Sequence, residues 1–274
     1  MTALRGSPAA LVGSVLLVVL AAVAALSYAG LLPYDPVAQN PPQRFLGPSG
    51  AHLFGTDQFG RDVFSRVAAG VGNSALIAVV AVAFAAVAGT LGGLVSGFYR
   101  GVADGMIGAV TNVLFAFPPL LLALSLAAVL DRTWFTIAVA IAVVYVPIFI
   151  RVTRGPVLTL REIEYVRAAV ATGQSRGQIM LRHVLPNITS IVVVQVALSL
   201  SWAVLTEASL SFLGLGTPPP APSLGSMIFE ARSLVFVAPW TLIAPGVVVV
   251  LLVVGLNLLG DGLRDALDPR NRGK

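Results

Sequence analysis

Six apolar runs, each about as long as a membrane-crossing helix, dominate the sequence. They cover residues 8–32, 72–98, 106–130, 134–150, 188–212 and 240–260. A helix needs roughly 20 apolar residues to cross about 30 Å of hydrocarbon, and a helix satisfies all of its backbone hydrogen bonds internally. The runs therefore predict an all-α polytopic membrane protein with six transmembrane helices. Pro118 and Pro119 are expected to kink the third of them.

The composition agrees with this fold class and argues against several kinds of site. Only 11% of the 274 residues are charged, against about a quarter in a typical soluble domain. The chain has no cysteine and two widely separated histidines, His52 and His183, so we expect no metal centre. Its one lysine is Lys274, whereas a Walker A loop needs a lysine within a glycine-rich turn. We expect neither a cofactor nor a catalytic residue in this chain.

The basic residues predict the orientation of the helices. If the N-terminus is cytoplasmic, the cytoplasmic loops hold twelve of the 17 basic residues and the external loops hold five. The cytoplasmic set is Arg5, Arg100, Arg151, Arg154, Arg161, Arg167, Arg176, Arg182, Arg264, Arg270, Arg272 and Lys274, and the external set is Arg44, Arg61, Arg66, Arg132 and Arg232. Because basic residues concentrate in cytoplasmic loops, both termini are predicted to be cytoplasmic. The net charge of +5 then reflects topology and not nucleic-acid binding.

The apolar runs divide the chain into regions. The expected regions are a first transmembrane helix (1–33), an external loop (34–71), a five-helix core (72–260) that includes a cytoplasmic segment (152–187) and an external loop (213–239), and a cytoplasmic tail (261–274). The first run could instead be a cleaved signal peptide, but its apolar core is longer than usual for one. The first external loop is expected to end in a short amphipathic helix, residues 60–71.

Glycines recur every four residues at the end of the second run. They are Gly89, Gly93, Gly97, Gly101 and Gly105. Small residues at this spacing allow two membrane helices to approach closely. We expect the first three at a helix–helix contact and the last two in the turn that follows.

The most charged segment, residues 161–187, is here called the elbow. Apolar residues recur at helical spacing from Ile163. Gly173 is expected to end this first helix, and Ser175, followed by glutamine three residues later, forms a capping-box pattern for a second one. Pro186 is expected to end the second helix. A rigid polar elbow of this kind suits docking into a cleft of a soluble partner.

The elbow resembles the cytoplasmic EAA loop of permease subunits in bacterial ABC importers. That loop has an alanine pair, a glycine four residues after the second alanine, and a Leu-Pro pair beyond. The matching residues are Ala168, Ala169, Gly173, Leu185 and Pro186. Two positions depart from the pattern, since Arg167 replaces the usual glutamate and His183 the usual isoleucine.

Three further stretches, 54–66, 207–216 and 257–270, are similar to the peptide- and nickel-importer branch with DppC/OppC-like subunits. The resemblance implies a type I ABC importer permease fold with a cytoplasmic coupling helix, in the bacterial cytoplasmic (inner) membrane. It implies a heterodimer with a second homologous permease, two ABC ATPase subunits that bind ATP and Mg²⁺, and an extracytoplasmic solute-binding protein. The implied cargo is a dipeptide or oligopeptide, with nickel or another small solute as the alternative.

Three sets of residues are candidates for function. The ATPase-coupling set is Glu164, Tyr165, Arg167, Ala168, Ala169, Gly173, Ser175, Arg182, His183, Leu185 and Pro186, the translocation-path set is Glu207, Asn112, Gln195 and Ser199, and the external-contact set is Asp57, Arg61 and Asp62. Each set has a structural alternative. The two alanines could serve ordinary packing, Glu207 could be paired near the outer interface, and amides and hydroxyls can hold membrane helices together. The external set could be a local network that caps the helix expected over 60–71.

Two other classes of protein are less consistent with the sequence. A stand-alone secondary transporter usually has internal repeats and several intramembrane charges, whereas almost every charge here lies outside the apolar runs. An intramembrane enzyme would need paired acid–base groups. The sequence has no His-Glu-x-x-His motif and no pair of aspartates within a run.

Overall fold

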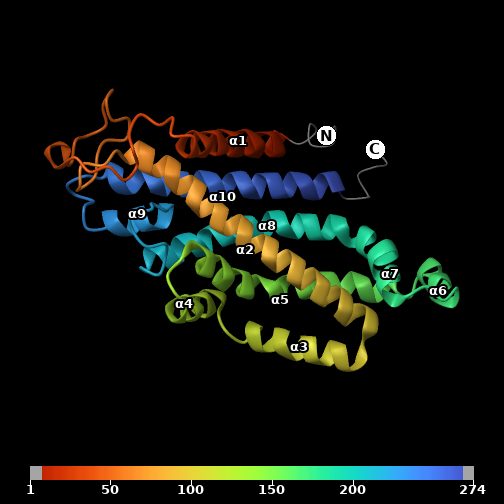
Figure 1. The fold of residues 1–274 in the computed structure, drawn as a ribbon. Helices are drawn as coiled ribbons and strands as arrows, with labels where there is room; N and C mark the ends of the chain where they lie inside the picture. Colours follow the sequence, from red (N-terminus) through yellow and green to blue (C-terminus); the bar gives the residue numbers. More distant parts are fainter. Residues whose placement is uncertain (1–7, 268–274) are drawn as a thin grey trace.

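The computed structural model describes residues 8–267, which form a bundle of long helices with no β-strand among them. The long helices are α1 (Pro8–Tyr28), α2 (Val63–Tyr99), α5 (Trp134–Leu160), α8 (Leu185–Phe212) and α10 (Trp240–Leu267). Figure 1 shows them side by side, with α2 crossing in front of α5 and α8. Most of their residues are apolar, and many remain exposed on the outside of the bundle. This arrangement suits a hydrocarbon environment.

The two ends of the bundle differ in structure. One end, here called the loop end, carries the loop between α1 and α2, the short 3-10 helix η2 (Pro41–Gln43) and α9 (Leu224–Ala231). The elbow lies at the opposite end, with α6 (Glu164–Ala171) and α7 (Arg176–Ile179). The first residues of α1 and the last residues of α10 both point toward the elbow end (Figure 1).

Five helices are long and apolar enough to cross a membrane, and a bent pair makes up to six. The bent pair is α3 (Gly101–Phe115) and α4 (Pro119–Val129), which meet at 91°. The sequence predicted one kinked helix here, and the structure has a break. Pro118 adopts an extended conformation, with φ −56° and ψ 131°, and Pro119 begins a new helix. Proline supplies no N–H and disfavours helix in the residue before it, so two in a row separate the helices.

Helices α2 and α5 extend well beyond the apolar runs that predicted them. Helix α2 begins at Val63 and not at residue 72. The amphipathic helix expected over 60–71 is therefore the first part of α2. The side chain of Asp62 caps it by accepting a hydrogen bond from the Ser65 N–H (2.8 Å). Helix α5 continues past Pro147 and Pro156 to Leu160, well beyond the expected residue 150. Hydropathy marks only the apolar part of a helix, and both helices have polar ends outside it.

The expected stop at Pro186 is wrong. The second elbow helix passes from α7 through a π-helical turn, η3 (Met180–Val184), directly into α8. Pro186 lies in the first turn of α8. A proline is tolerated in a first turn, where its missing N–H has no intrahelical partner to lose. The elbow is therefore rigidly continuous with a membrane-crossing helix.

The glycine spacing marks a close helix contact in the bundle, between α2 and α5. A Cβ atom added to Gly93 would lie 2.6 Å from the Cβ of Thr153, and one added to Gly97 would lie 2.8 Å from the Cβ of Val157. Gly89 packs equally closely on Phe149. The expected contact of these three glycines is confirmed.

The other two glycines of the series differ from each other. Gly101 has φ +57° and follows the reversal at Arg100, as a turn residue should. Gly105 was expected in the same turn, but it lies inside α3, because that helix starts directly at Gly101.

Gly93→Ala is expected to destabilise the protein by about 1–3 kcal/mol, because the added methyl group overpacks the α2–α5 contact. The matched control is Gly105→Ala, where nothing lies within 4 Å of the added Cβ. Alanine favours a helix interior over glycine by roughly 0.5–1 kcal/mol, so the control should be neutral or stabilising. Thermal unfolding of the two purified variants checks this, and equal melting temperatures would contradict the close contact.

Candidate functional site

The elbow has a small apolar core of its own. Val166 and Ala169 of α6 are buried against Ile179 and Val184, and this cluster continues onto the elbow-end residues of α2 and α5. Gly173 reverses the chain between the two elbow helices with φ +79°, a backbone conformation that favours glycine. The packing fixes the orientation of α6 relative to the bundle.

Hydrogen bonds close the turns of the elbow. The Ser175 hydroxyl accepts from the Gln178 N–H (3.3 Å), the cap expected for α7. His183 Nε2 lies 3.1 Å from the side-chain oxygen of Gln174, which links the second elbow helix to the turn before it. The sequence motif therefore describes a folded unit and not a flexible connector.

The outer surface of α6 is exposed. Ala168 and Arg167 point outward, and Tyr165 and Val170 are 42% and 55% exposed. The alanine pair is thus divided, because Ala169 is only 6% exposed and packs inward. Ordinary packing accounts for Ala169 and not for Ala168. Glu164 at the start of α6 is exposed. Beyond α6, Arg182 and Pro186 are exposed while His183 and Leu185 are half-buried.

Charged side chains hold the elbow to α2 and α3. Arg161 Nη1 donates to the carbonyl of Phe98 (2.6 Å), and Arg100 Nη2 lies 3.0 Å from Glu162 Oε1. Near them Arg154 of α5 makes two hydrogen bonds of 2.7 Å to the carboxylate of Asp104 in α3. The sequence analysis missed this pair, since no spacing rule relates residues so far apart in the chain.

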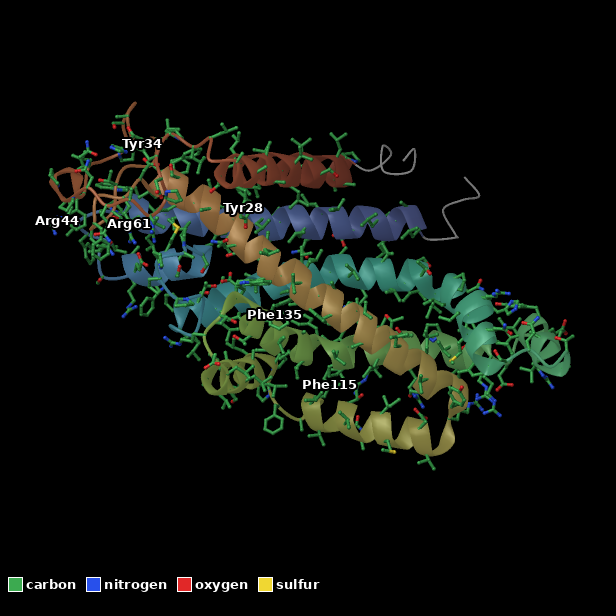
Figure 2. The ribbon with its side chains drawn as sticks, in the orientation of Figure 1. Tyr28, Tyr34, Arg44, Arg61, Phe115 and Phe135 are labelled. Carbon is green, nitrogen blue, oxygen red and sulfur yellow. The ribbon has the colours of Figure 1, made fainter. Side chains whose placement is uncertain are left out.

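A buried network of charges holds the loop end together. Arg61 bridges two acids, with Nε 2.6 Å from Asp57 Oδ2 and Nη2 2.7 Å from Glu230 Oε2. Arg66 lies beside the same acids, 3.6 Å from Asp57 and 3.2 Å from Glu230. The network ties the loop between α1 and α2 to α9. We call Asp57, Arg61, Arg66 and Glu230 the loop-end network, and Figure 2 shows Arg61 in this crowded region with Tyr34 and Arg44.

The three residues of the external-contact set all face inward. Asp57, Arg61 and Asp62 are 5%, 6% and 4% exposed. Besides capping α2, Asp62 lies 2.9 Å from Nδ1 of His52, whose ring stacks on Tyr34 at 4.6 Å between centroids. Their geometry supports the local-network alternative, and contact with the binding protein or the partner permease stays a prediction. Sequence reasoning missed Arg66 and Glu230, which complete the network.

Glu207 lies where α2, α8 and α9 meet, and it has no exposed surface. Its Oε1 accepts from the Ser211 hydroxyl (2.7 Å), and Ser223 donates in turn to Ser211 (3.2 Å). On the other side, the Ser74 hydroxyl accepts from the backbone N–H of Leu224 at the start of α9 (3.3 Å). Glu207 therefore belongs to a buried group of hydroxyls that joins the three helices. This position favours the structural alternative over the translocation path.

Glu207→Gln is expected to change solute uptake by less than about twofold, because glutamine fills the same space and its carbonyl can still accept from Ser211. Glu207→Ala is expected to lower thermal stability by about 1–3 kcal/mol, because the Ser211 hydroxyl then lacks its acceptor. Uptake and melting temperature of both variants provide the check. Loss of uptake in a stable, correctly assembled Glu207→Gln variant would show that Glu207 takes part in translocation.

The remaining candidates for the path lie in two separate places. Asn112 lines a cavity of about 490 Å³ between α3 and α5, together with Arg151 and Arg154. Gln195 lines a different cavity of about 290 Å³ and donates to the Ser199 hydroxyl (3.0 Å). A path through both stays a prediction. Among residues 8–267, no cluster of three or more His, Asp or Glu side chains could hold a metal ion.

Comparison with known proteins agrees with this architecture. Residues 89–273 match the family described as "Binding-protein-dependent transport system inner membrane component". The chain is 41% identical to the dipeptide transport system permease protein DppC of Alkalihalophilus pseudofirmus, over 97% of this chain and 88% of that protein. It is 42% identical to the glutathione transport system permease protein GsiD of Pectobacterium atrosepticum, over 88% and 80%.

A third relative and one solved structure complete the comparison. The chain is 39% identical to the probable D,D-dipeptide transport system permease protein DdpC of Escherichia coli, over 99% of this chain and 91% of that protein. It superposes on a chain of the inward-facing MetNI methionine ABC transporter with a TM-score of 0.59 and 20% identity, covering 73% of this chain and 94% of the other. The family match covers more than half of the chain. Each of the three relatives is more than one third identical in sequence to this chain over most of its length. The chain therefore belongs to the binding-protein-dependent transport system inner membrane components, the multi-pass permease subunits of ABC importers.

Proposed function

We propose that this chain forms one half of the translocation path of an ATP-driven importer of dipeptides or other small peptides. The observation that carries the proposal is the elbow, a packed and capped helical unit with an exposed outer face that continues rigidly into α8. A rigid helical unit that continues into a membrane helix can transmit the motion of a partner, so that the membrane helices rock as a rigid body. The relatives named for dipeptides and glutathione support a small peptide as cargo over nickel.

The proposal includes partners that this chain needs for transport. They are a second homologous permease as the other half of a heterodimer, two ABC ATPases that bind ATP and Mg²⁺ against the elbows, and an extracytoplasmic solute-binding protein. Support comes from the membership in a binding-protein-dependent family and from the single lysine, which rules out a Walker A loop in this chain. ATP hydrolysis then belongs to the partner subunits.

The proposed orientation places the elbow and both termini in the cytoplasm. The excess of basic residues on that side supports it. The first residues of α1 and the last of α10 also point toward the elbow end (Figure 1). The loop end then faces outward, where a solute-binding protein would dock.

Uptake in proteoliposomes tests the function. The two permeases and ATPases are reconstituted together, and entry of a radiolabelled dipeptide is measured with the binding protein present. Uptake that needs ATP and stops when the ATPases are inactivated supports the proposal. Uptake driven by a proton or sodium gradient with this chain alone would support a secondary transporter instead.

A further inference from the structure

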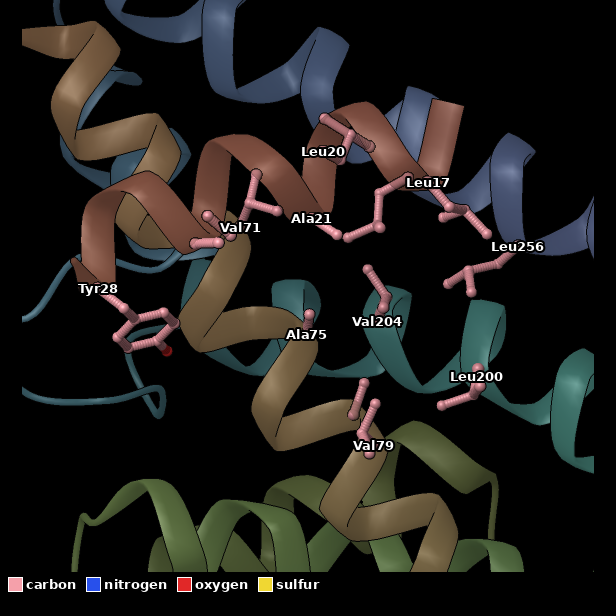
Figure 3. Close-up of a pocket in the computed structure, with 14 residues that line it drawn as sticks. Leu17, Leu20, Ala21, Tyr28, Val71, Ala75, Val79, Leu200, Val204 and Leu256 are labelled. Atoms are coloured by element: carbon pink, nitrogen blue, oxygen red, sulfur yellow. The ribbon is translucent and has the colours of Figure 1, made fainter. Parts of the chain in front are cut away.

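An apolar cavity of about 410 Å³ lies among α1, α2, α8 and α10. Figure 3 shows Leu17 and Leu20 of α1, Ala75 of α2, and Val204 and Leu200 of α8 around it. Every lining residue is aliphatic except Tyr28, at the loop-end limit of the cavity. The cavity is distinct from the elbow and from the loop-end network.

Water is a poor filling for this cavity, because the lining is almost entirely aliphatic. A buried water needs two to four polar partners, which the aliphatic lining does not offer. The lining therefore favours an apolar occupant.

The cavity is continuous with the lateral surface of the bundle. The exposed residues of its lining lie on α1 and α2, and they include Ala21, Ala25 and Val79. Beside them, Val18 of α1 is 66% exposed and Leu76 of α2 is 44% exposed. On a membrane-crossing bundle, such an apolar lateral surface meets the lipid chains. The medium that reaches this opening is hydrocarbon.

The loop-end limit of the cavity is polar. The ring of Tyr28 packs directly over Gly72, where an added Cβ would lie 2.7 Å from a ring carbon. The Tyr28 hydroxyl donates to Asn73 Oδ1 (3.3 Å), and Asn73 Nδ2 donates to the carbonyl of Pro222 (2.7 Å). Tyrosine is enriched at the boundary between hydrocarbon and headgroups. The site thus has an apolar body and a polar end, which is also the order of an acyl chain and its ester group.

We propose that this cavity binds one acyl chain of a membrane phospholipid, with the ester end beside Tyr28 and Asn73. The lipid fills the space between α1 and the rest of the bundle and holds α1 in place. The inference depends on the chain crossing a membrane and not on which solute it imports. Failure of the uptake experiment would therefore not contradict the proposed lipid site.

Photolabelling of the assembled transporter tests the proposal. The complex is reconstituted in vesicles of phosphatidylethanolamine and phosphatidylglycerol that contain a phosphatidylethanolamine with a diazirine on one acyl chain. After illumination, labelled residues are identified by peptide mass spectrometry. We expect labels on the parts of α1 and α2 that line the cavity, around Ala21 and Ala75.

Two neighbouring substitutions on α2 separate the cavity from the outer surface. Ala75→Phe places a ring in the cavity and should reduce its labelling by about fivefold or more, because the space is already filled. Leu76→Phe, on the exposed side and outside the lining, should leave the labelling unchanged. Equal labelling of the two variants would overturn the proposal. So would labelling only by a free diazirine fatty acid, or a crosslink from a photoreactive residue at position 75 to the second permease in place of lipid.

Discussion

Ala168→Trp is expected to reduce ATP-driven uptake at least about tenfold, which corresponds to the loss of only about 1.4 kcal/mol at an interface. The side chain of Ala168 is exposed on α6, whereas its neighbour Ala169 is buried in the elbow core. A large ring at position 168 therefore obstructs docking of an ATPase without disturbing the fold. Uptake and ATP hydrolysis of the reconstituted complex are measured together. Hydrolysis is expected to lose its stimulation by the loaded binding protein.

The matched control for Ala168→Trp is Val102→Trp. Val102 is 80% exposed near the start of α3, at the same end of the bundle but away from α6. Tryptophan is well accommodated at a membrane interface, so the control should transport at the parental rate. If the two variants transport equally well and assemble at equal levels, α6 is not the docking surface.

Arg66→Ala is expected to destabilise the protein by about 3–5 kcal/mol, the range for removing one partner of a buried ion pair. Arg66 is 2% exposed and lies beside buried Asp57 and half-buried Glu230, so its loss leaves these two acids with Arg61 as their remaining basic partner in the network. At roughly 2–4 °C per kcal/mol, the melting temperature should fall by about 6–20 °C.

The control for this prediction is Arg232→Ala. Arg232 also belongs to the loop end, but it is exposed and lies over the ring of Phe229. Surface substitutions usually change stability by about 0.5 kcal/mol or less. Thermal unfolding of both purified variants makes the comparison. A melting temperature for Arg66→Ala equal to that of Arg232→Ala would show that the loop-end network contributes little.

The sequence predicted features that depend on local pattern. The apolar runs located the long helices because burial in hydrocarbon demands an uninterrupted stretch. The spacing of Gly89, Gly93 and Gly97 located the α2–α5 contact, since one face of a helix recurs about every four residues. Gly173 and Ser175 located the turn and the cap of the elbow by their conformational preferences.

The sequence could not predict contacts between distant segments. Nothing near Arg66 indicates that it meets Glu230, because only the folded loop end brings α9 beside the start of α2. The same holds for Arg154 with Asp104. The stop expected at Pro186 was wrong for a different reason. A proline that ends one helix and a proline in the first turn of the next have the same sequence, and the π-helical turn before it has no clear signature.

Labelling of a single cysteine at position 168 tests the central claim most directly, that the elbow lies in the cytoplasm against an ATPase. The chain has no native cysteine, so Ala168→Cys introduces a unique thiol. A membrane-impermeant maleimide should label it in inverted vesicles that lack the ATPases and not in intact cells. In inverted vesicles with the ATPases bound, the thiol should be protected. Labelling of Ala168→Cys from outside intact cells would contradict the account.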